Sequence, residues 1–338
     1  MEFAGGGRLE VRITPSDVGK RVSVRRVAEI VGGRPVFSDV VGLLTSWANG
    51  VLIVTRRNGG AVHIAEQTLA AGKIVPDRPA RPRRATPPVA TAHELQELAS
   101  RGWPALDTER LGDWTLRASA GFTRRANSVL PLGDPGLPLD AAIQRVRDWY
   151  GERGLVPYVQ VATGTMDSDE RLDAELARDG WTAEAFTLVC TGPIAPVADG
   201  PGAERVTLSR VPDAAWLSRY HRTGELAATA VRVLTGGPSV WFATIPGGAQ
   251  GPAAIGRCVA DGRWAQFGAV EVDPQYRRAG LATAVMAALA RRALDEGATG
   301  GYLQVEEENE GARALYERMG FTTHHGYHYR RAAQGGTR

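Results

Sequence analysis

A segment near the C-terminus combines two arginines, a glycine and the start of a helix, a combination suited to binding phosphate. Val270 and Val272 lie in a short apolar run that a proline ends, which is typical of a buried strand. Apolar residues then recur at helical spacing, at Leu281, Val285, Ala288 and Leu289. The first N–H groups of a helix have no partner within it, so they can bind an anion. Arg277 and Arg278 add positive charge, and Gly280 lets a ligand approach the backbone. The segment therefore predicts a pyrophosphate site.

A second motif lies downstream, at residues 309–321, after another buried strand predicted for the apolar run 302–305. Asn309, Ala312 and Tyr316 fall on one face of a helix that a glycine is suited to end. Taken alone, the first motif could equally be an ordinary strand, turn and helix with surface arginines. The second motif, in this order along the chain, favours a functional site.

The two motifs resemble those of the GNAT superfamily of acyl-CoA N-acyltransferases. Its loop, Arg/Gln-x-x-Gly-x-Gly/Ala, is matched by Arg277, Gly280 and Ala282, and its element Asn-x-x-Ala-x-x-Leu-Tyr-x-x-x-Gly-Phe is matched by residues 309–321. The resemblance covers residues 203–332. It implies the GNAT fold, of the α+β or α/β class, with a central mixed β-sheet and flanking helices. It also implies acetyl-CoA as cosubstrate.

The resemblance implies a place for each part of acetyl-CoA. Pantetheine would lie along the strand 270–272, splayed from its neighbour near 303–305, with the N–H of Val272 polarising the thioester carbonyl. The diphosphate would bind the N–H groups of residues 278–282. The implied binding residues are Val270, Val272, Arg277, Arg278, Ala279, Gly280, Leu281, Ala282, Asn309 and Tyr316.

Tyr316 matches the family's tyrosine that meets the thiol sulfur, so the resemblance implies that it protonates the leaving thiolate. A phenol of pKa about 10 can donate to a thiolate of pKa about 8.5 when the two are held together. The alternative is a helical tyrosine buried as core.

The general base is harder to assign from the sequence. Positions where the family often has a carboxylate carry Gln266, Gly268 and Gln304, none of which can accept a proton. Glu271 is close, but strand alternation points it away from the cofactor face, so it serves only if strand splay or a bulge redirects it. Further candidates are His221 and Glu225. A last alternative is that water removes the proton from the amine.

Three histidines near the C-terminus raise the alternative of a metal site. Alternation in a predicted last strand puts His324 and His325 on opposite faces, and no cluster of Cys or carboxylate joins them and His328 in a zinc site. No metal is therefore expected. The two cysteines, Cys190 and Cys258, lack metal-ligand spacing and fit a reducing cytoplasm.

The N-terminal part differs in composition from the rest of the 338-residue chain. Residues 1–77 hold short β-branched runs between turn residues and resemble a small all-β SH3-like barrel. Residues 78–89 read as an Arg/Pro-rich linker. Residues 1–88 carry a formal charge of +7, and the remainder −4. The basic part could bind nucleic acid or an acidic macromolecule, the alternative being a solvated surface.

The middle block, residues 90–200, repeats the pattern of the C-terminal block, residues 201–332. Matching pairs at one offset of 144 are Gly136-Leu137 with Gly280-Leu281 and Tyr158–Val161 with Tyr302–Val305. In the middle copy, however, Asp134 and two prolines occupy the place of the arginine loop, and Leu176 replaces the tyrosine. We interpret residues 90–200 as a degenerate GNAT-like domain and residues 201–332 as the catalytic one. The arrangement resembles actinobacterial GNAT proteins with an SH3-like N-terminal domain and a tandem acyltransferase region.

The sequence thus predicts an acetyl-CoA-dependent N-acetyltransferase that acts by direct transfer to a primary amine, a small molecule or amino acid being favoured. One alternative is a protein-lysine or nucleoid-protein acetyltransferase whose basic N-terminal part recruits the substrate. Another is a catalytically weak acyl-CoA-binding regulator. Neither a signal peptide nor a membrane span is expected, which favours the cytoplasm. The protein is expected to be a monomer or a homodimer.

Overall fold

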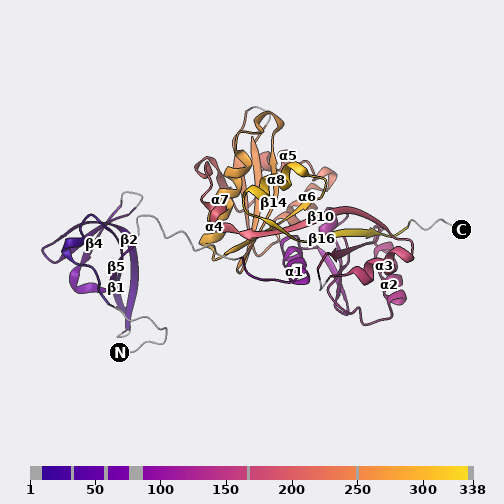
Figure 1. The fold of residues 1–338 in the computed structure, drawn as a ribbon, viewed down its shortest axis with the longest axis horizontal. Coiled ribbons are helices and arrows are strands. Elements are labelled where there is room, and N and C mark those ends of the chain that lie inside the picture. Colours follow the sequence, from indigo (N-terminus) through magenta and orange to yellow (C-terminus); the bar gives the residue numbers. More distant parts are fainter. Residues whose placement is uncertain are drawn as a thin grey trace. The chain divides into compact units, whose positions relative to one another are not determined.

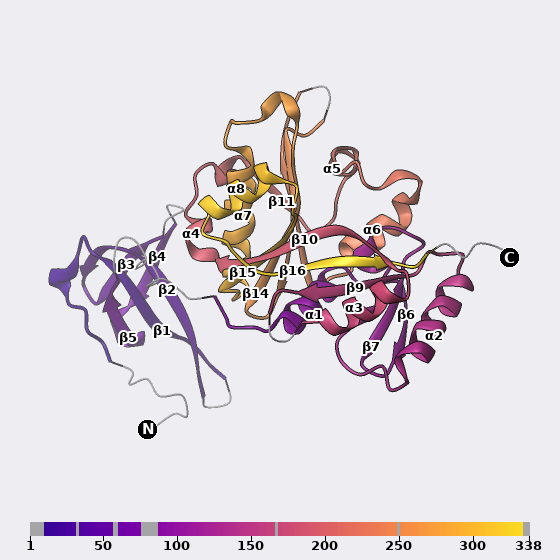
Figure 2. The same cartoon turned by 45° about the vertical axis from the view of Figure 1, so that its right-hand side comes forward.

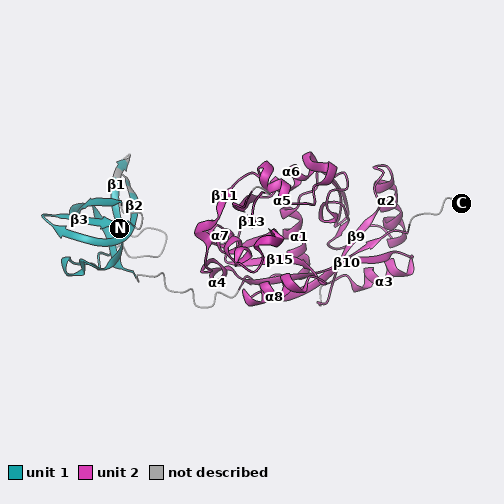
Figure 3. Cartoon of the chain, turned by 90° about the horizontal axis from the view of Figure 1, so that it is seen from above, with its two compact units in different colours: residues 1–83 teal, residues 84–338 magenta. Residues whose placement is uncertain are grey.

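The chain forms two compact units, Met1–Arg83 and Arg84–Arg338 (Figure 3). The computed structural model describes residues 10–31, 34–56, 60–75, 87–165, 168–248 and 251–333. In this described part of the chain, no helix is long and apolar enough to cross a membrane. The segment 76–86 lies outside the described residues, so most of the predicted Arg/Pro-rich linker does too.

The N-terminal unit is an antiparallel sheet of five strands in the order β4-β3-β2-β1-β5. Its strands are β1 (Arg21–Val31), β2 (Arg34–Ala48), β3 (Val51–Thr55), β4 (Ala61–Ala65) and β5 (Leu69–Ile74). Alternate residues such as Val22, Val24, Leu52 and Val54 are buried in one core, as period-two patterning requires. The pairings of the described residues do not close the sheet into a barrel. The finding is therefore an antiparallel sheet, and the likeness to SH3 domains stays a prediction.

The second unit contains one sheet of eight strands with helices on both faces (Figure 1). The strand order is β11-β12-β13-β14-β15-β10-β16-β9, and a separate three-stranded sheet has the order β6-β7-β8. The helices are α1 (Ala92–Gly102), α2 (Leu139–Gly151), α3 (Glu170–Arg178), α4 (Ile194–Ala198), α5 (Ala214–Arg219), α6 (Ala227–Thr235), α7 (Leu281–Asp295) and α8 (Glu310–Arg318). The strands are β6 (Asp107–Leu111), β7 (Trp114–Ala118), β8 (Leu130–Pro131), β9 (Tyr158–Thr163), β10 (Thr182–Pro193), β11 (Thr207–Ser209), β12 (Ser239–Ile245), β13 (Ala254–Asp261), β14 (Trp264–Val272), β15 (Gly300–Glu306) and β16 (Thr322–Arg331).

The two faces of the large sheet bury different helices, which can be followed in Figure 2. On one face, Leu303 packs in a core with Val285 and Leu289 of α7. On the other face, the neighbouring residue Tyr302 packs in a core with Leu95 of α1. Because successive side chains of a strand point to opposite faces, β15 is covered on both sides, which agrees with the burial of its residues 300–303.

The second unit repeats a helix-strand-helix-strand pattern, as the sequence predicted. In the middle half (residues 90–200) it runs α2, β9, α3, β10, and in the C-terminal half (residues 201–332) it runs α7, β15, α8, β16. The predicted helix over Leu139–Gly151 is confirmed. The two halves contribute strands to one sheet. Their description as two separate domains therefore stays a prediction.

The two halves exchange their last strands. β10 of the middle half pairs with β15 of the C-terminal half, and β16 of the C-terminal half pairs with β9 of the middle half. The exchanged strands also pair with each other, which closes the centre of the sheet. The middle half is therefore built into the sheet that carries the predicted site.

Candidate active site

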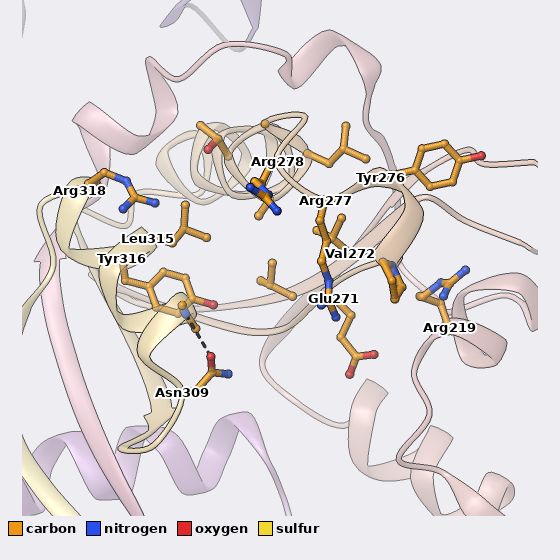
Figure 4. Close-up of a pocket in the computed structure, with 18 of the residues that line it drawn as sticks. Arg219, Glu271, Val272, Tyr276, Arg277, Arg278, Asn309, Leu315, Tyr316 and Arg318 are labelled. Atoms are coloured by element: carbon orange, nitrogen blue, oxygen red, sulfur yellow. Dashed lines mark hydrogen bonds between the residues drawn. The ribbon is translucent and has the colours of Figure 1, made fainter.

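The predicted site lies where two parallel strands separate. β14 pairs with β15 from Trp264↔Gly300 to Phe267↔Leu303, yet β14 continues to Val272 and β15 to Glu306. A cleft of about 930 Å³ opens beyond this last pair. Its walls are the end of β14, the loop before α7, the first turn of α7, and one side of α8 (Figure 4). The structure thus brings both sequence motifs to one cleft.

The strand on one side of the cleft offers a backbone donor. The N–H of Asp273 donates to the carbonyl of Ala253 at 2.9 Å. In an antiparallel pair, the N–H groups of successive residues point to opposite sides of the strand. The N–H of Val272 therefore points away from β13, toward the opening between β14 and β15. This is the donor predicted to polarise a thioester carbonyl.

The loop between β14 and α7 forms an anion cradle. Arg278 and Gly280 both have positive φ, of 60° and 74°, which turns successive N–H groups to one side. The first backbone bond of α7 is donated by Ala284 to Gly280 at 3.0 Å, so the N–H groups of residues 281–283 precede the helical ladder. A Cβ on Gly280 would meet open space, so a ligand can approach the backbone there. These features fit the diphosphate of CoA.

The predicted binding residues line this cleft with one exception. Those on its wall are Val270, Glu271, Val272, Arg277, Arg278, Gly280, Leu281, Ala282, Asn309 and Tyr316. Ala279 is exposed and does not line the cleft, so it can take part only through its backbone. Asn309 also has a structural task, because its Oδ1 accepts the N–H of Ala312 at 3.1 Å and caps α8.

A buried ion pair that sequence reasoning missed holds the cradle in place. Asp273 accepts the N–H of Gln275 at 2.8 Å and pairs with Arg219. Arg219 also donates through Nε to the carbonyl of Pro252 at 3.0 Å. An aspartate immediately before a proline is a known cap signal, so Asp273 could have been recognised as the start of the turn. Its partner, 54 residues away, could not.

Tyr316 projects from α8 toward β14 (Figure 4). It packs against the main core, and its ring lies edge-on to Phe321 with 6.3 Å between ring centroids. Burial raises the pKa of Tyr316 to about 12. The hydroxyl therefore keeps its proton at neutral pH and can donate it. Burial disfavours any anion, so a thiolate in the same place would also have a raised pKa, which favours proton transfer to it.

Glu271 faces the cleft because β14 contains a bulge. Ile255 pairs with Glu271 and Arg257 with Gly268, so two residues of β14 lie opposite Gly256 alone. The bulge includes Ala269, whose φ is 51°. Ile255 and Arg257 are two apart on β13, so Glu271 lies on the same face as Gly268. Glu271 still alternates with Val270 and Val272, which pack against the core of α7. The bulge, which the sequence analysis named as one condition, is what brings Glu271 to the face of Gly268.

The surroundings of Glu271 suit a proton acceptor. Its side chain is 23% exposed, and the guanidinium of Arg222 lies 3.8 Å away. Burial raises the pKa of Glu271, while the charges of Arg222, His221 and Arg219 act in the opposite direction. The overall shift is upward, so the carboxylate binds a proton more readily than an ordinary glutamate.

The other base candidates are placed less favourably. The buried amide of Gln266 has no hydrogen-bond partner among the described residues, and Gln304 accepts a hydrogen bond from Arg125 at 2.7 Å. His221 lines the cleft, whereas Glu225 is exposed and does not.

The C-terminal histidines bond to protein groups, and their predicted placement needs one correction. A register shift of β16 near His324 brings its ring to that of His325, with 2.9 Å between the two Nδ1 atoms. Strict alternation, which put them on opposite faces, was therefore wrong. His328 bonds to Asp173 at 2.8 Å. Among the described residues, no group of three or more His, Cys, Asp and Glu could hold a metal ion.

The corresponding loop of the middle half is filled by the protein itself. Asp134 accepts the N–H of Gly136 at 2.8 Å, so that donor is already satisfied. The backbone of Asp134 and Pro135 lies against Gly112, where even a Cβ would come within 2.4 Å. Leu176, at the position that corresponds to Tyr316, is fully buried. These contacts agree with a half that does not bind a diphosphate.

The fold and the cleft define a GNAT-type acyltransferase. Two solved structures share the fold: a GCN5-related N-acetyltransferase from Kribbella flavida (TM-score 0.51, 16% identity, 73% of this chain and 98% of that chain) and a tandem GNAT protein from the clavulanic acid biosynthesis pathway (TM-score 0.52, 15% identity, 75% and 91%). A family model described as "Probable histone acetyltransferase Rv0428c C-terminal" matches residues 90–330. The chain belongs to this family, and the match spans both halves of the second unit.

Two bacterial proteins match most of the chain. "Probable histone acetyltransferase Rv0428c" of Mycobacterium tuberculosis is 28% identical over 318 residues, covering 92% of this chain and 94% of the relative. "Uncharacterized N-acetyltransferase YobR" of Bacillus subtilis is 26% identical over 256 residues, covering 70% and 97%. The first likeness includes the N-terminal unit.

Proposed function

We propose that this enzyme transfers an acetyl group from acetyl-CoA to a primary amine by direct attack. The observation that carries the proposal is the bulge at Ala269, which gives the cleft a carboxylate at Glu271 opposite the hydroxyl of Tyr316. A cleft with a proton acceptor on one wall, a proton donor on another and an anion cradle at its end suits this reaction.

Bound acetyl-CoA supplies an activated acyl carbon, to which the amine nitrogen bonds while the carbon–sulfur bond breaks. The N–H of Val272 stabilises negative charge on the acyl oxygen. Glu271 takes the proton that the amine loses, directly or through water, and Tyr316 gives its proton to the departing sulfur. Arg277, Arg278 and the first N–H groups of α7 hold the diphosphate.

The position of Glu271 argues against the alternative of a CoA-binding regulator. That alternative rested on the two glutamines in the places of a base. Because Glu271 offers a proton acceptor in the cleft, the presence of Gln266 and Gln304 at the expected base positions is no longer an argument against catalysis.

A protein acceptor is the second candidate, and the name of the Mycobacterium tuberculosis relative favours it. In this case the basic N-terminal unit would recruit an acidic or nucleic-acid-associated substrate. We expect cytoplasmic action as a monomer or homodimer in either case.

The test is a screen with release of free CoA thiol as the readout. Amino acids, polyamines, aminoglycosides and lysine-containing peptides would each be supplied with acetyl-CoA. Turnover of any amine supports the enzyme. Binding of acetyl-CoA without turnover across the whole panel would refute it and support the regulator.

A further inference from the structure

A second, smaller cavity of about 270 Å³ adjoins the cleft, and Arg222 lines both. Its wall combines the two halves: Arg124 and Arg125 come from the middle half, and Tyr327 and Tyr329 from β16. Burial raises the pKa of Tyr220, another lining residue, and the charges of Arg125 and Glu271 both act on its hydroxyl. Because Arg222 lines this cavity and its Nε lies 3.8 Å from Oε1 of Glu271, the cavity lies close to that carboxylate.

Arg125 has only neutral partners within the described part of the chain. Its Nε donates to Oε1 of Gln304 at 2.7 Å, and its guanidinium lies 5.8 Å from the ring centroid of Trp103. The adjacent Arg124, by contrast, pairs with Glu184 at 2.7 Å. A half-buried charge without a counter-ion is costly, and a ligand carboxylate would remove that cost.

Other arginines with neutral partners do not share this position. Arg117 donates to the carbonyl of Ser128 at 2.9 Å, and Arg257 to that of Leu234 at 2.7 Å. Both are buried in the protein interior, and neither lines this cavity. Arg125 is exposed to it, so its charge is available to a ligand.

Two more polar groups of the cavity wall lack a well-formed hydrogen bond. The hydroxyl groups of Tyr327 and Tyr329 are buried and make no hydrogen bond of good geometry to a described residue, although both lie near each other and near the guanidinium of Arg125. Buried polar groups are normally satisfied, so these two hydroxyls are suited to donate to a ligand anion. The carboxylate of Glu306 also lines the cavity, from an exposed position at the end of β15.

We propose that the acceptor carries a carboxylate near its amine, and that Arg125 binds this carboxylate while the amine reaches the cleft beside Glu271. A guanidinium binds a carboxylate through two parallel hydrogen bonds, which fixes orientation as well as charge. The middle half, whose own loop is filled, thus supplies the specificity of the C-terminal half. This inference rests on the proposed acetyl transfer.

The test compares free amino acids with their carboxamides, acetyl-CoA being the donor. The two series differ only in the negative charge. The wild-type enzyme should prefer the free acids in kcat/KM by roughly 30-fold or more, the lower range for losing one partner of a buried charge pair. Arg125→Gln should abolish this preference, so that the ratio of kcat/KM for acids and carboxamides falls to about one.

Two further variants control for general effects. Arg124→Gln removes the same charge from the same cavity wall and should keep the preference, because that arginine already has an acid partner. Arg125→Lys keeps the charge but not the planar fork, so an intermediate preference is expected. Thermal unfolding of each variant would establish that the fold is retained. Equal rates on acids and carboxamides in the wild type, or an undiminished preference in Arg125→Gln, would overturn the inference.

Binding is measured separately from turnover, so the two proposals fail in different ways. Calorimetry on the CoA-saturated protein would compare the same amino acids and carboxamides. If no amine is acetylated, the proposed function falls, while acid binding that Arg125→Gln removes would still support the carboxylate site. Absence of acid binding in the wild type would refute that site, whatever the enzyme turns over.

Discussion

Replacement of Glu271 by glutamine tests the chemistry most directly. The substitution keeps the size of the side chain and one oxygen acceptor but removes the ability to take a proton. A general base typically raises a reaction rate about 10²–10⁴-fold. An amine that is already partly neutral depends on the base for only part of this rate increase. We therefore expect kcat/KM near neutral pH to fall by about 10²–10³-fold, or roughly 3–4 kcal/mol of transition-state stabilisation. Arg222 is mostly exposed, so loss of this ion pair adds little.

The dependence of the rate on pH tests the role of Glu271 most specifically. Because the pKa of Glu271 is raised, the wild-type rate should fall on the acidic side through a pKa above that of an ordinary glutamate. This limb should disappear in Glu271→Gln, and the deficit of the variant should shrink as rising pH deprotonates the free amine. Thiol release across the pH range, at saturating acetyl-CoA, measures both.

The thermal stability of the protein gives an independent measure of the burial of the Glu271 carboxyl. A carboxyl whose folded-state pKa is raised stabilises the fold below its unfolded pKa and loses that contribution as pH rises through the folded pKa. At neutral pH the charge opposes folding, so Glu271→Gln should raise Tm slightly. Glu225→Gln, which makes the same change outside the cleft, should alter neither rate nor Tm. A Glu271→Gln variant with the wild-type rate and an intact acidic limb would refute the assignment.

Four further predictions concern other parts of the molecule. Tyr316→Phe keeps the ring in the core and should lower kcat by roughly 10²-fold with acetyl-CoA binding unchanged; a wild-type kcat with chemistry rate-limiting would make it a packing residue. Alanine at both Arg277 and Arg278 should raise KM for acetyl-CoA without lowering Tm, and an unaltered KM would contradict the diphosphate site. Calorimetry should find one acetyl-CoA per chain; two would mean that the middle half also binds it. Removal of residues 1–86 should leave turnover of small amines unchanged but lower activity on an acidic macromolecule at low salt. The difference between full-length and truncated protein on that macromolecule should narrow as salt rises. Loss of small-amine turnover in a folded truncation would instead give the N-terminal unit a part in the acceptor site.

Local patterns in the sequence predicted much of this fold. The helix over Leu139–Gly151 and the strand-loop-helix of the cradle follow from apolar spacing and from the positions of proline and glycine. The motif residues then meet in one cleft, because each motif follows one of two neighbouring parallel strands that separate toward their C-terminal ends.

Features that depend on distant contacts could not be predicted. The bulge at Ala269 has a positive φ at a residue that is not glycine, so nothing in the local sequence indicates it. Arg125 is separated from Gln304 by 179 residues, and composition gives no sign of their contact. The same holds for the strand exchange, since β10 and β16 have the patterning of any half-buried strand and could pair in either order.

The strand exchange also has a consequence for how the protein is made. The strand β16, Thr322–Arg331, is synthesised after the whole middle half, yet it lies between β10 and β9 of that half. Until it leaves the ribosome, β9 exposes an unpaired edge to the cell. Such an edge is prone to pair with other chains, and contacts this distant in sequence form slowly. The sheet therefore cannot be completed before β16 is made, and loss of Thr322–Arg331 would deprive β10 and β9, both of the middle half, of the strand that lies between them.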